Sequence, residues 1–272
     1  MTVTGFLHPG AMGSTIGATC RGDRFWVGAG RSAASRFRAD AAGLVDAGSL
    51  EQLAKRCDTI VSVCPPGEAL AVARQVADTA FGGVYIDANA ISPDSTARIG
   101  ELFDRYVDGG IIGPPAERAG TTRMYLSGDQ AAMVAPRWDG SVLDVRVIEG
   151  GVGAASAVKM LFAGWGKHNA ALMLATNAVA EAYGVTDAIR GEWKISRPDF
   201  VAESEAAAER TSPKAWRFEG EMHEIADTFA AAGQPAEFHL AAAEVFRRMA
   251  GFKDPVEPVT LDDVVAALRD QR

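Results

Sequence analysis

Apolar positions in the first half of the chain occur in short runs, and amphipathic stretches lie between several of these runs. The short runs have the length and composition of β-strands. They predict strands at Val3–Leu7, Arg24–Val27, Thr59–Val63, Gly83–Asp87, Tyr106–Gly109, Arg123–Ser127 and Val145–Ile148. Helical spacing is seen at Gly13–Ala18 and Gly67–Ala80. Because strands that alternate with helices form parallel sheets, this half predicts a Rossmann-like, doubly wound α/β domain over residues 1–150.

From Gly151 onward the strand pattern disappears and alanine becomes frequent. Ala154–Tyr183 predicts one long helix. We therefore expect an all-α domain over residues 151–272, joined to the first domain by a long interdomain helix.

Start and stop signals divide the rest of this second half into helices. Ser212-Pro213 predicts a helix start, with serine at the N-cap and proline at the first helical position, and Gly233 predicts its end. Pro235–Ala250 predicts another helix, closed by Gly251. Thr260 and Asp263 have the spacing of a capping box before a short last helix.

Composition and charge exclude several classes of function. The chain has 272 residues, 48% of them hydrophobic, and a net charge of −8. No Lys/Arg cluster indicates nucleic acid, and the longest apolar stretch, near Ala170–Ala175, is far shorter than the ~20 residues of a membrane span. The 3 cysteines have no metal-binding spacing, and we see no signal peptide. We expect a cytoplasmic, metal-free protein.

The segment His8-Pro9-Gly10-Ala11-Met12-Gly13 follows the first predicted strand and opens a helix. The dinucleotide fingerprint G-x-G-x-x-G has the same place in a βαβ unit. Its second and third glycines are present, whereas His8 replaces the first, so the tight turn must be made differently. We expect Gly10, Ala11 and Met12 to bind the phosphates of a dinucleotide at the helix N-terminus. A plain strand-to-helix turn is the alternative.

The segment after the second predicted strand indicates which dinucleotide is bound. NAD-binding proteins place an acid here for the ribose 2′-hydroxyl, and this chain has none. Arg31 and Ser32 instead offer a guanidinium and a hydroxyl that suit a 2′-phosphate, and Arg36 and Arg38 lie nearby. The sequence therefore predicts NADP (NADPH) as the cofactor, against the alternative of a solvated loop arginine.

Cys64-Pro65-Pro66 follows the strand Thr59–Val63, at the sheet edge where such folds bind ligands. We expect these three residues to line the cofactor. No histidine is placed to activate Cys64, so the sequence does not favour a nucleophilic thiol.

A glycine-rich bend, Gly150–Gly153, leads into the long helix, and Lys159 follows one to two turns later. A lysine in an apolar cleft loses solvation, which lowers its pKa and makes it a usable proton donor or acceptor. A solvated helix lysine is the alternative reading of this residue alone.

These features, in this order, resemble the β-hydroxyacid dehydrogenase / 6-phosphogluconate dehydrogenase superfamily over nearly the whole chain. The segment 216–226 resembles the phosphogluconate-dehydrogenase-like C-terminal domain of proteins with unassigned substrates. The resemblance implies hydride transfer between NAD(P) and an alcohol or carbonyl substrate, and a homodimer formed through the helical domain. It implies that Lys159 is the catalytic acid/base and that Asn89 lies near the nicotinamide, able to hydrogen-bond cofactor or substrate.

The chain departs from the family at the substrate contacts. Ile112 replaces the serine of the family's Ser-Gly-Gly motif. Phe162 replaces the first residue of the family's Asn-Asn pair, and Glu221 replaces a lysine. Because apolar and acidic groups repel a carboxylate, we expect a small-molecule substrate that is not a simple hydroxycarboxylate. The expected substrate-contacting residues are Ile112, Gly113, Phe162, Lys167 and Trp216.

Two other functions stay open. An imine reductase on the same scaffold explains the lost carboxylate contacts and Glu221, although those enzymes usually carry aspartate or tyrosine at the position of Lys159. A non-catalytic NADP-binding protein explains the missing substrate contacts in a different way.

Overall fold

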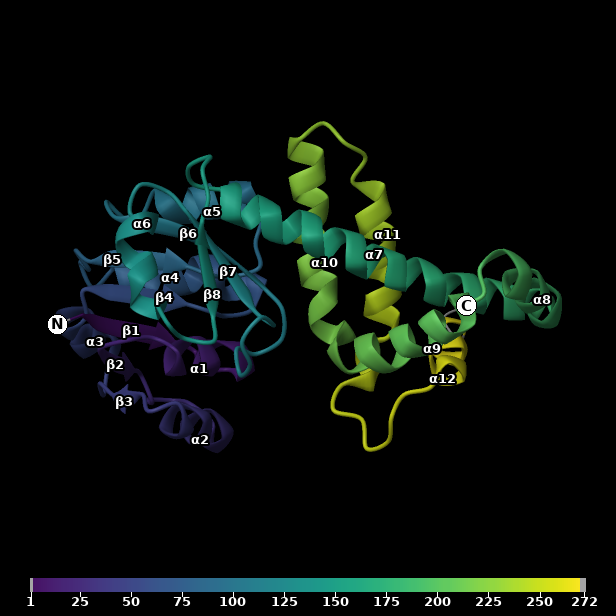
Figure 1. Cartoon of the computed structure of the whole chain (residues 1–272), viewed down its shortest axis with the longest axis horizontal. Helices are drawn as coiled ribbons and strands as arrows, with labels where there is room; N and C mark the ends of the chain where they lie inside the picture. Colours follow the sequence, from purple (N-terminus) through teal and green to yellow (C-terminus); the bar gives the residue numbers. More distant parts are fainter. Residues whose placement is uncertain (1, 270–272) are drawn as a thin grey trace. The chain divides into compact units, whose positions relative to one another are not determined.

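The computed structural model describes residues 2–269, which divide into two compact units after Met160 (Figure 1). The strands of the first unit are β1 (Val3–Leu7), β2 (Asp23–Trp26), β3 (Val45–Asp46), β4 (Thr59–Ser62), β5 (Val84–Asp87), β6 (Tyr106–Ile112), β7 (Arg123–Ser127) and β8 (Asp144–Val147). Its helices are α1 (Ala11–Ala18), α2 (Ala33–Ala41), α3 (Leu50–Arg56), α4 (Ala69–Ala77), α5 (Pro93–Gly100) and α6 (Ala131–Val134), with 3-10 turns η1 (Pro66–Glu68) and η2 (Ala135–Trp138).

All the strands of the first unit form one sheet in the order β3-β2-β1-β4-β5-β6-β7-β8. Every neighbouring pair is parallel except β6 and β7. The chain reverses its direction of winding between β1 and β4, and folds of this kind bind ligands outside the carboxyl ends of the strands at that point. The doubly wound sheet confirms the predicted fold class.

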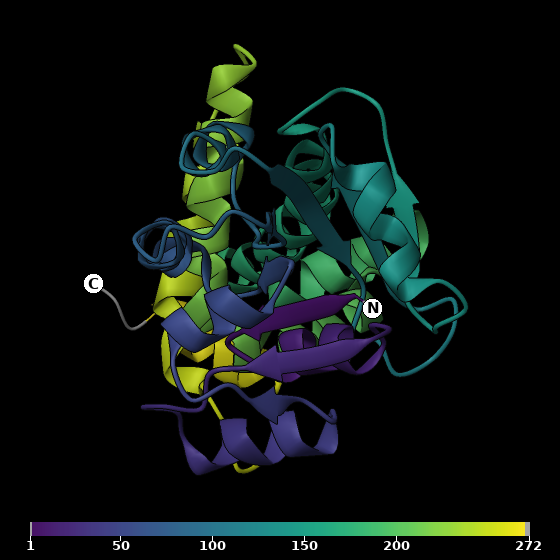
Figure 2. The ribbon, with the colours of Figure 1, turned by 90° about the vertical axis from the view of Figure 1, so that its left-hand side faces the viewer.

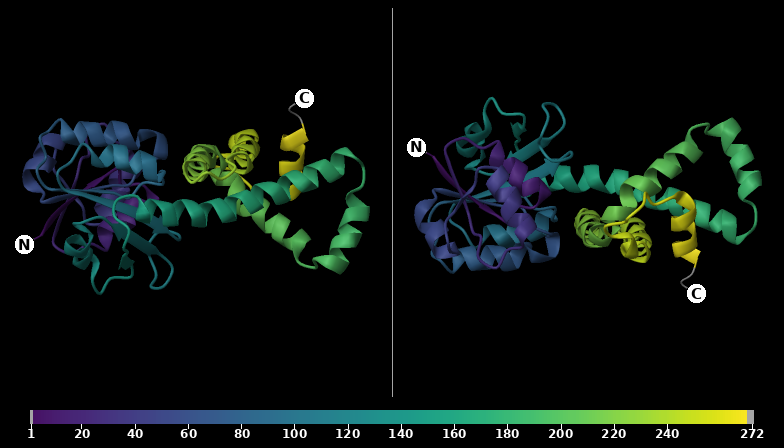
Figure 3. Two further views of the ribbon diagram at one scale, coloured as in Figure 1. Left: turned by 90° about the horizontal axis from the view of Figure 1, so that it is seen from above. Right: turned by 90° about the horizontal axis from the view of Figure 1, so that it is seen from below.

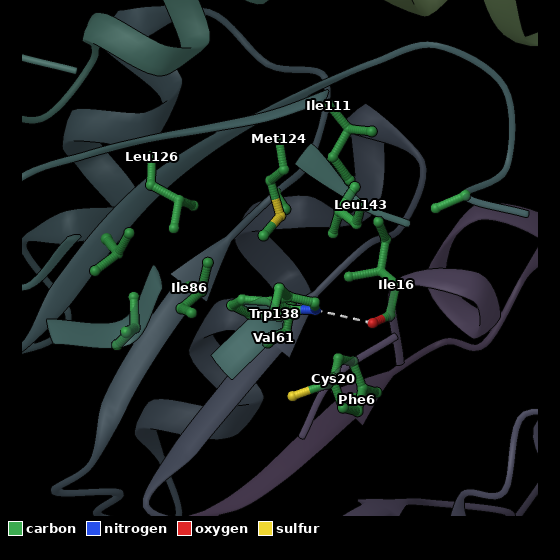
Figure 4. Packing of buried hydrophobic residues seen from close by; sticks show 14 of the residues in the cluster. Phe6, Ile16, Cys20, Val61, Ile86, Ile111, Met124, Leu126, Trp138 and Leu143 are labelled. Atoms are coloured by element: carbon green, nitrogen blue, oxygen red, sulfur yellow. Dashed lines mark hydrogen bonds between the residues drawn. The ribbon is translucent and has the colours of Figure 1, made fainter. Parts of the chain in front are cut away.

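Alternating side chains of the strands pack on opposite faces of the sheet. Phe6, Val61 and Ile86 belong to one buried cluster, and their sequence neighbours, such as Leu7 and Ile60, belong to another. The first cluster packs under α1, α2 and α6, and the second under α3, α4 and α5. Figure 4 shows the first cluster, in which the indole Nε1 of Trp138 donates to the carbonyl of Ile16 at 3.0 Å. In Figure 2, α2 lies beside the β2–β3 edge.

The regular elements of the second unit are all helices in its described residues, as predicted. The long helix α7 (Ala154–Ala182) begins in the first unit and continues into the second. The other elements are α8 (Thr186–Ser196), α9 (Phe200–Thr211), η3 (Ser212–Lys214), α10 (Ala215–Ala231), α11 (Glu237–Arg248), η4 (Ala250–Phe252) and α12 (Leu261–Arg269). Figure 3 shows α10 and α11 end-on and side by side.

The structure departs from the sequence prediction at three places. Strand β3 was not predicted, because a strand of two exposed residues has no alternation to detect. Strand β6 continues to Ile112 rather than ending at Gly109, since it pairs with β7 as far as Arg123. Ser212 does not cap α10: its buried hydroxyl donates to the carbonyl of Ala208 in α9. The capping box of α12 is confirmed, because Thr260 and Asp263 exchange hydrogen bonds.

Candidate functional site

The loop between β1 and α1 has the geometry of a dinucleotide-binding turn. His8 has a φ of 60°, the left-handed conformation that glycine adopts most easily, so its backbone makes the turn without a first glycine. A Cβ on Gly13 would lie 2.9 Å from the carbonyl oxygen of His8, so only glycine allows α1 to approach this closely. Gly10 is the N-cap of α1 and has no side chain that could accept from the first N–H groups of the helix, and the first turn of α1 contains no acid. The free N–H groups of Ala11 and Met12 therefore remain suited to an anion.

Arg31 lies close to this loop. Burial, together with the charge of Arg31, lowers the pKa of His8 to about 4. Among the described residues, Nδ1 of His8 and Nε of Arg31 are buried without a hydrogen-bond partner. Two nitrogens without protein partners, beside a helix N-terminus and a guanidinium, fit the anionic part of a dinucleotide.

The start of α2 extends this positively charged region. Ser32 is the N-cap of α2, where its hydroxyl oxygen accepts from the backbone N–H of Ser35 at 3.2 Å. The hydroxyls of Ser32 and Ser35 also lie 3.1 Å apart, where either can donate to the other. The first turn of α2 contains no acid. Arg38 is used internally instead: its Nε donates to the carbonyl of Pro9 at 3.2 Å and its Nη2 to Ser35. Arg38 therefore ties α2 to the β1–α1 loop.

Cys64 and Pro65 lie in the loop that follows β4, and Pro66 begins η1. Asn89 lies beneath this loop and is 2% exposed. Its Oδ1 accepts from the backbone N–H of Cys64 at 2.6 Å, and its Nδ2 donates to Ser62 at 3.2 Å. These bonds make Asn89 a support of the loop. Burial raises the pKa of the Cys64 thiol to about 12, even though Ser62 lies within hydrogen-bonding distance.

Lys159 is on the second turn of α7, and a buried acid holds the start of that helix. The carboxylate of Asp108, in β6, accepts from the backbone N–H groups of Gly153 and Ser156. A Cβ on Gly110 would collide with the carbonyl oxygen of Ala155 and lie 3.0 Å from Cβ of Lys159. The bare backbone at Gly110 therefore lets α7 lie directly on β6 and fixes the base of the Lys159 side chain.

The remaining predicted substrate residues are divided between the two units. In the first, Ile112 is buried within β6, whereas Gly113 is exposed and has a φ of 122°. In the second, Phe162 is 60% exposed.

Lys167 and Trp216, also in the helical unit, both have charged partners. Nζ of Lys167 lies 2.7 Å from Oε2 of Glu221 and above the ring of Phe218. Nζ of Lys253 lies above the ring of Trp216. The Lys167–Glu221 pair was missed by sequence reasoning, because the two residues come from different helices, α7 and α10.

Residues 2–269 contain no group of three or more His, Cys, Asp or Glu side chains arranged to hold a metal ion. None of the helices in that range is both long enough and apolar enough to cross a membrane.

Comparison with known proteins identifies similar sequences and folds. Residues 180–249 match a family described as "Domain of unknown function (DUF1932)". An uncharacterised 28.5 kDa protein of Methanothermus fervidus is 30% identical over 165 residues, which are 58% of this chain and 62% of that protein. The match thus spans less than two thirds of that relative.

Two solved structures extend the comparison to nearly the whole chain. One is a conserved protein of unknown function described as structurally similar to 3-hydroxyacid dehydrogenases; it has a TM-score of 0.67 and 25% identity, with 92% of this chain and 97% of the other covered. The other is a 3-hydroxyisobutyrate dehydrogenase of Mycobacterium tuberculosis, with a TM-score of 0.70, 18% identity and 99% of each chain covered. Over nearly its whole length, the chain therefore shares the fold of the 3-hydroxyacid dehydrogenase-like proteins, the superfamily that its sequence motifs resemble.

Proposed function

We propose that the protein is an NADP(H)-dependent oxidoreductase that transfers a hydride between the nicotinamide and a carbonyl or alcohol substrate. The observation that carries this proposal is the β1–α1 loop, in which His8 takes the left-handed conformation of the missing glycine and Gly13 lets α1 pack closely. The orphaned nitrogens of His8 and Arg31 fit the phosphates of such a cofactor. When bound, the nicotinamide supplies the hydride chemistry.

NADP rather than NAD is favoured by three groups at the start of α2. Arg31 supplies a guanidinium, Ser32 a hydroxyl, and α2 an N-terminus whose first turn is free of acids. All three stabilise the added charge of a 2′-phosphate.

The chain's own contribution to the chemistry is proton transfer by Lys159. The Asp108 cap and the close approach at Gly110 fix the helix turn that carries Lys159. The backbone from which its amine extends therefore has a defined position. A rigid support of this kind is what proton transfer at a chosen substrate oxygen requires.

The substrate is proposed to be a small molecule other than a simple hydroxycarboxylate. At the position of the family's substrate-binding serine, Ile112 is buried and offers no hydrogen bond from its side chain. The same observation favours an imine as a second candidate substrate, since an imine needs no carboxylate contact.

A homodimer formed through the helical unit is also proposed. The part of α7 in that unit exposes Leu161, Trp165, Leu172 and Val179. Their spacing of four or seven residues puts them on one face of the helix, and such a stripe is typical of helix association. Light scattering at micromolar concentration should give the mass of a dimer, and the mass of a monomer would contradict this part of the proposal.

The test of the function combines binding with turnover. Purified protein is titrated with NADPH, and NADPH consumption is then followed with panels of ketones, aldehydes and cyclic imines. Lys159→Met should bind NADPH as the wild type does and lose turnover by at least about a hundredfold, the usual scale of acid–base catalysis. Unchanged turnover would remove Lys159 from the mechanism, and tight binding without turnover on any panel would favour a non-catalytic NADP-binding protein.

A further inference from the structure

The carboxyl end of β2 carries no acid of its own, but β3 brings one to it. Strands β2 and β3 pair in parallel, with Trp26 opposite Asp46. Oδ1 of Asp46 accepts from the backbone N–H of Gly28 at 3.0 Å and from that of Gly48 at 2.9 Å. Two backbone bonds therefore fix the carboxylate of Asp46 just beyond the end of β2.

Asp46 fills the space that a side chain at position 28 would occupy. A Cβ built on Gly28 would collide with Oδ2 of Asp46, and would lie 3.0 Å from its Cγ and 3.1 Å from Nη1 of Arg36. In NAD-binding sheets, an acid at the end of β2 holds the ribose hydroxyls of the adenosine. Here the glycine at that position makes room for an acid that comes from the next strand.

One oxygen of this carboxylate remains available to a ligand. Oδ1 is occupied by the two backbone N–H groups, whereas Oδ2 accepts no hydrogen bond from residues 2–269, and Asp46 is an exposed residue. The backbone bonds from Gly48 and Gly28, and then the charge of Arg36, hold the pKa of Asp46 below its usual value. The group is thus a charged acceptor at neutral pH.

We propose that Asp46 is a cofactor-discriminating residue: its Oδ2 accepts a hydrogen bond from the ribose 2′-hydroxyl of NAD(H), and its charge opposes a 2′-phosphate. This inference rests on the proposed function in one respect, which is that a dinucleotide binds at this edge. Arg31 and Ser32 attract the 2′-phosphate while Asp46 repels it. The chain therefore binds both NADH and NADPH, and Asp46 reduces its preference for NADPH.

The substitution Asp46→Asn tests this directly. The asparagine oxygen can keep the bonds from Gly28 and Gly48, which leaves an NH₂ group in the place of Oδ2. That group cannot accept from a ribose hydroxyl, but it can donate to a phosphate. Calorimetry measures the affinities of the wild type and of Asp46→Asn for NADH and NADPH. The affinities of both proteins for 5′-AMP and 2′,5′-ADP, which carry only the adenosine end of the cofactors, are measured in the same way.

The expected result is a rise of at least about tenfold in the ratio of NADPH to NADH affinity, equivalent to ~1.4 kcal/mol, with a parallel rise for the 2′-phosphorylated fragment over 5′-AMP. The matched control Asp78→Asn, at an exposed position at the end of α4, should leave both ratios unchanged. A ratio in Asp46→Asn within twofold of the wild type would overturn the inference. Failure of the wild type to bind either cofactor would instead refute the proposed function. Asp46→Ser carries the same prediction if thermal melting shows that the asparagine variant is unfolded.

Discussion

Removal of the Asp108 carboxylate should destabilise the first unit more than any surface substitution. The residue is 0% exposed. Its carboxylate accepts five hydrogen bonds, from the hydroxyls of Thr96 (3.3 Å), Ser127 (3.0 Å) and Ser156 (2.6 Å) and from the backbone N–H groups of Gly153 (2.9 Å) and Ser156 (3.0 Å). These bonds join β6, β7, α5 and the start of α7.

The size of the effect follows from which donors can find another partner. In Asp108→Ala, the three hydroxyls can rotate toward other acceptors, but the N–H groups of Gly153 and Ser156 are fixed and buried. Each buried donor without a partner costs roughly 1–3 kcal/mol. With a small cavity added, the free energy of unfolding should fall by about 4 kcal/mol. In Asp108→Asn, one oxygen can still accept the two N–H groups, so the loss should be about half as large.

Urea unfolding followed by circular dichroism measures these differences. Asp40→Ala, at an exposed position in α2, is the matched control and should change the free energy of unfolding by less than about 0.5 kcal/mol. A loss below about 1 kcal/mol for Asp108→Ala would refute the reasoning, because it would mean that the start of α7 does not depend on this carboxylate.

Three further predictions concern other residues of the two units. Because burial raises the pKa of Cys64 to about 12, its alkylation in the native protein at neutral pH should be slow. Mass spectrometry measures the rate of alkylation, and a rate as fast in the native protein as in the urea-unfolded protein would contradict this. The pKa of His8 is lowered to about 4, mainly by burial, so the unfolded chain binds a proton on this residue more tightly than the folded protein does. The free energy of unfolding should therefore fall as the pH drops from about 6.5 toward 4. His8→Gln should weaken this pH dependence, and an identical pH profile for the variant would count against the prediction. Glu221→Ala leaves the partly buried ammonium of Lys167 without this carboxylate, so the free energy of unfolding should fall by about 3 kcal/mol. The double variant Lys167→Met/Glu221→Met should recover much of that lost stability in urea titrations. No recovery would mean that the unpaired charge of Lys167 does not cause the loss.

The regular elements and the position of the cofactor loop could be predicted from the sequence, because both depend on local patterns. Apolar runs predicted the strands β1, β2 and β4 through β8, and the glycines at 10 and 13 marked the start of α1. The sequence also indicated that His8 must make its turn in an unusual way. That it does so by taking a positive φ is a result of the surrounding packing, which no local pattern encodes.

The parts of the site that were missed are contacts between distant segments. Asp46 reaches Gly28 across 18 residues, from a strand too short to predict. Asp108 stands in an apolar run, and that position was the only signal that it is buried. The bonds of Asn89 to Ser62 and to the backbone of Cys64 were not foreseen either, while its contact with cofactor or substrate stays a prediction. Each depends on which strands are neighbours, and so on the topology of the sheet.

Calorimetric titration of the wild type and of Arg31→Ala with NADPH measures whether the β1–α1 loop and Arg31 hold a dinucleotide. We expect one NADPH bound per chain in the wild type and at least about tenfold weaker binding in Arg31→Ala, with the same melting temperature for both proteins in the absence of cofactor. Absence of binding in the wild type, or equal affinity in the two proteins, would contradict it.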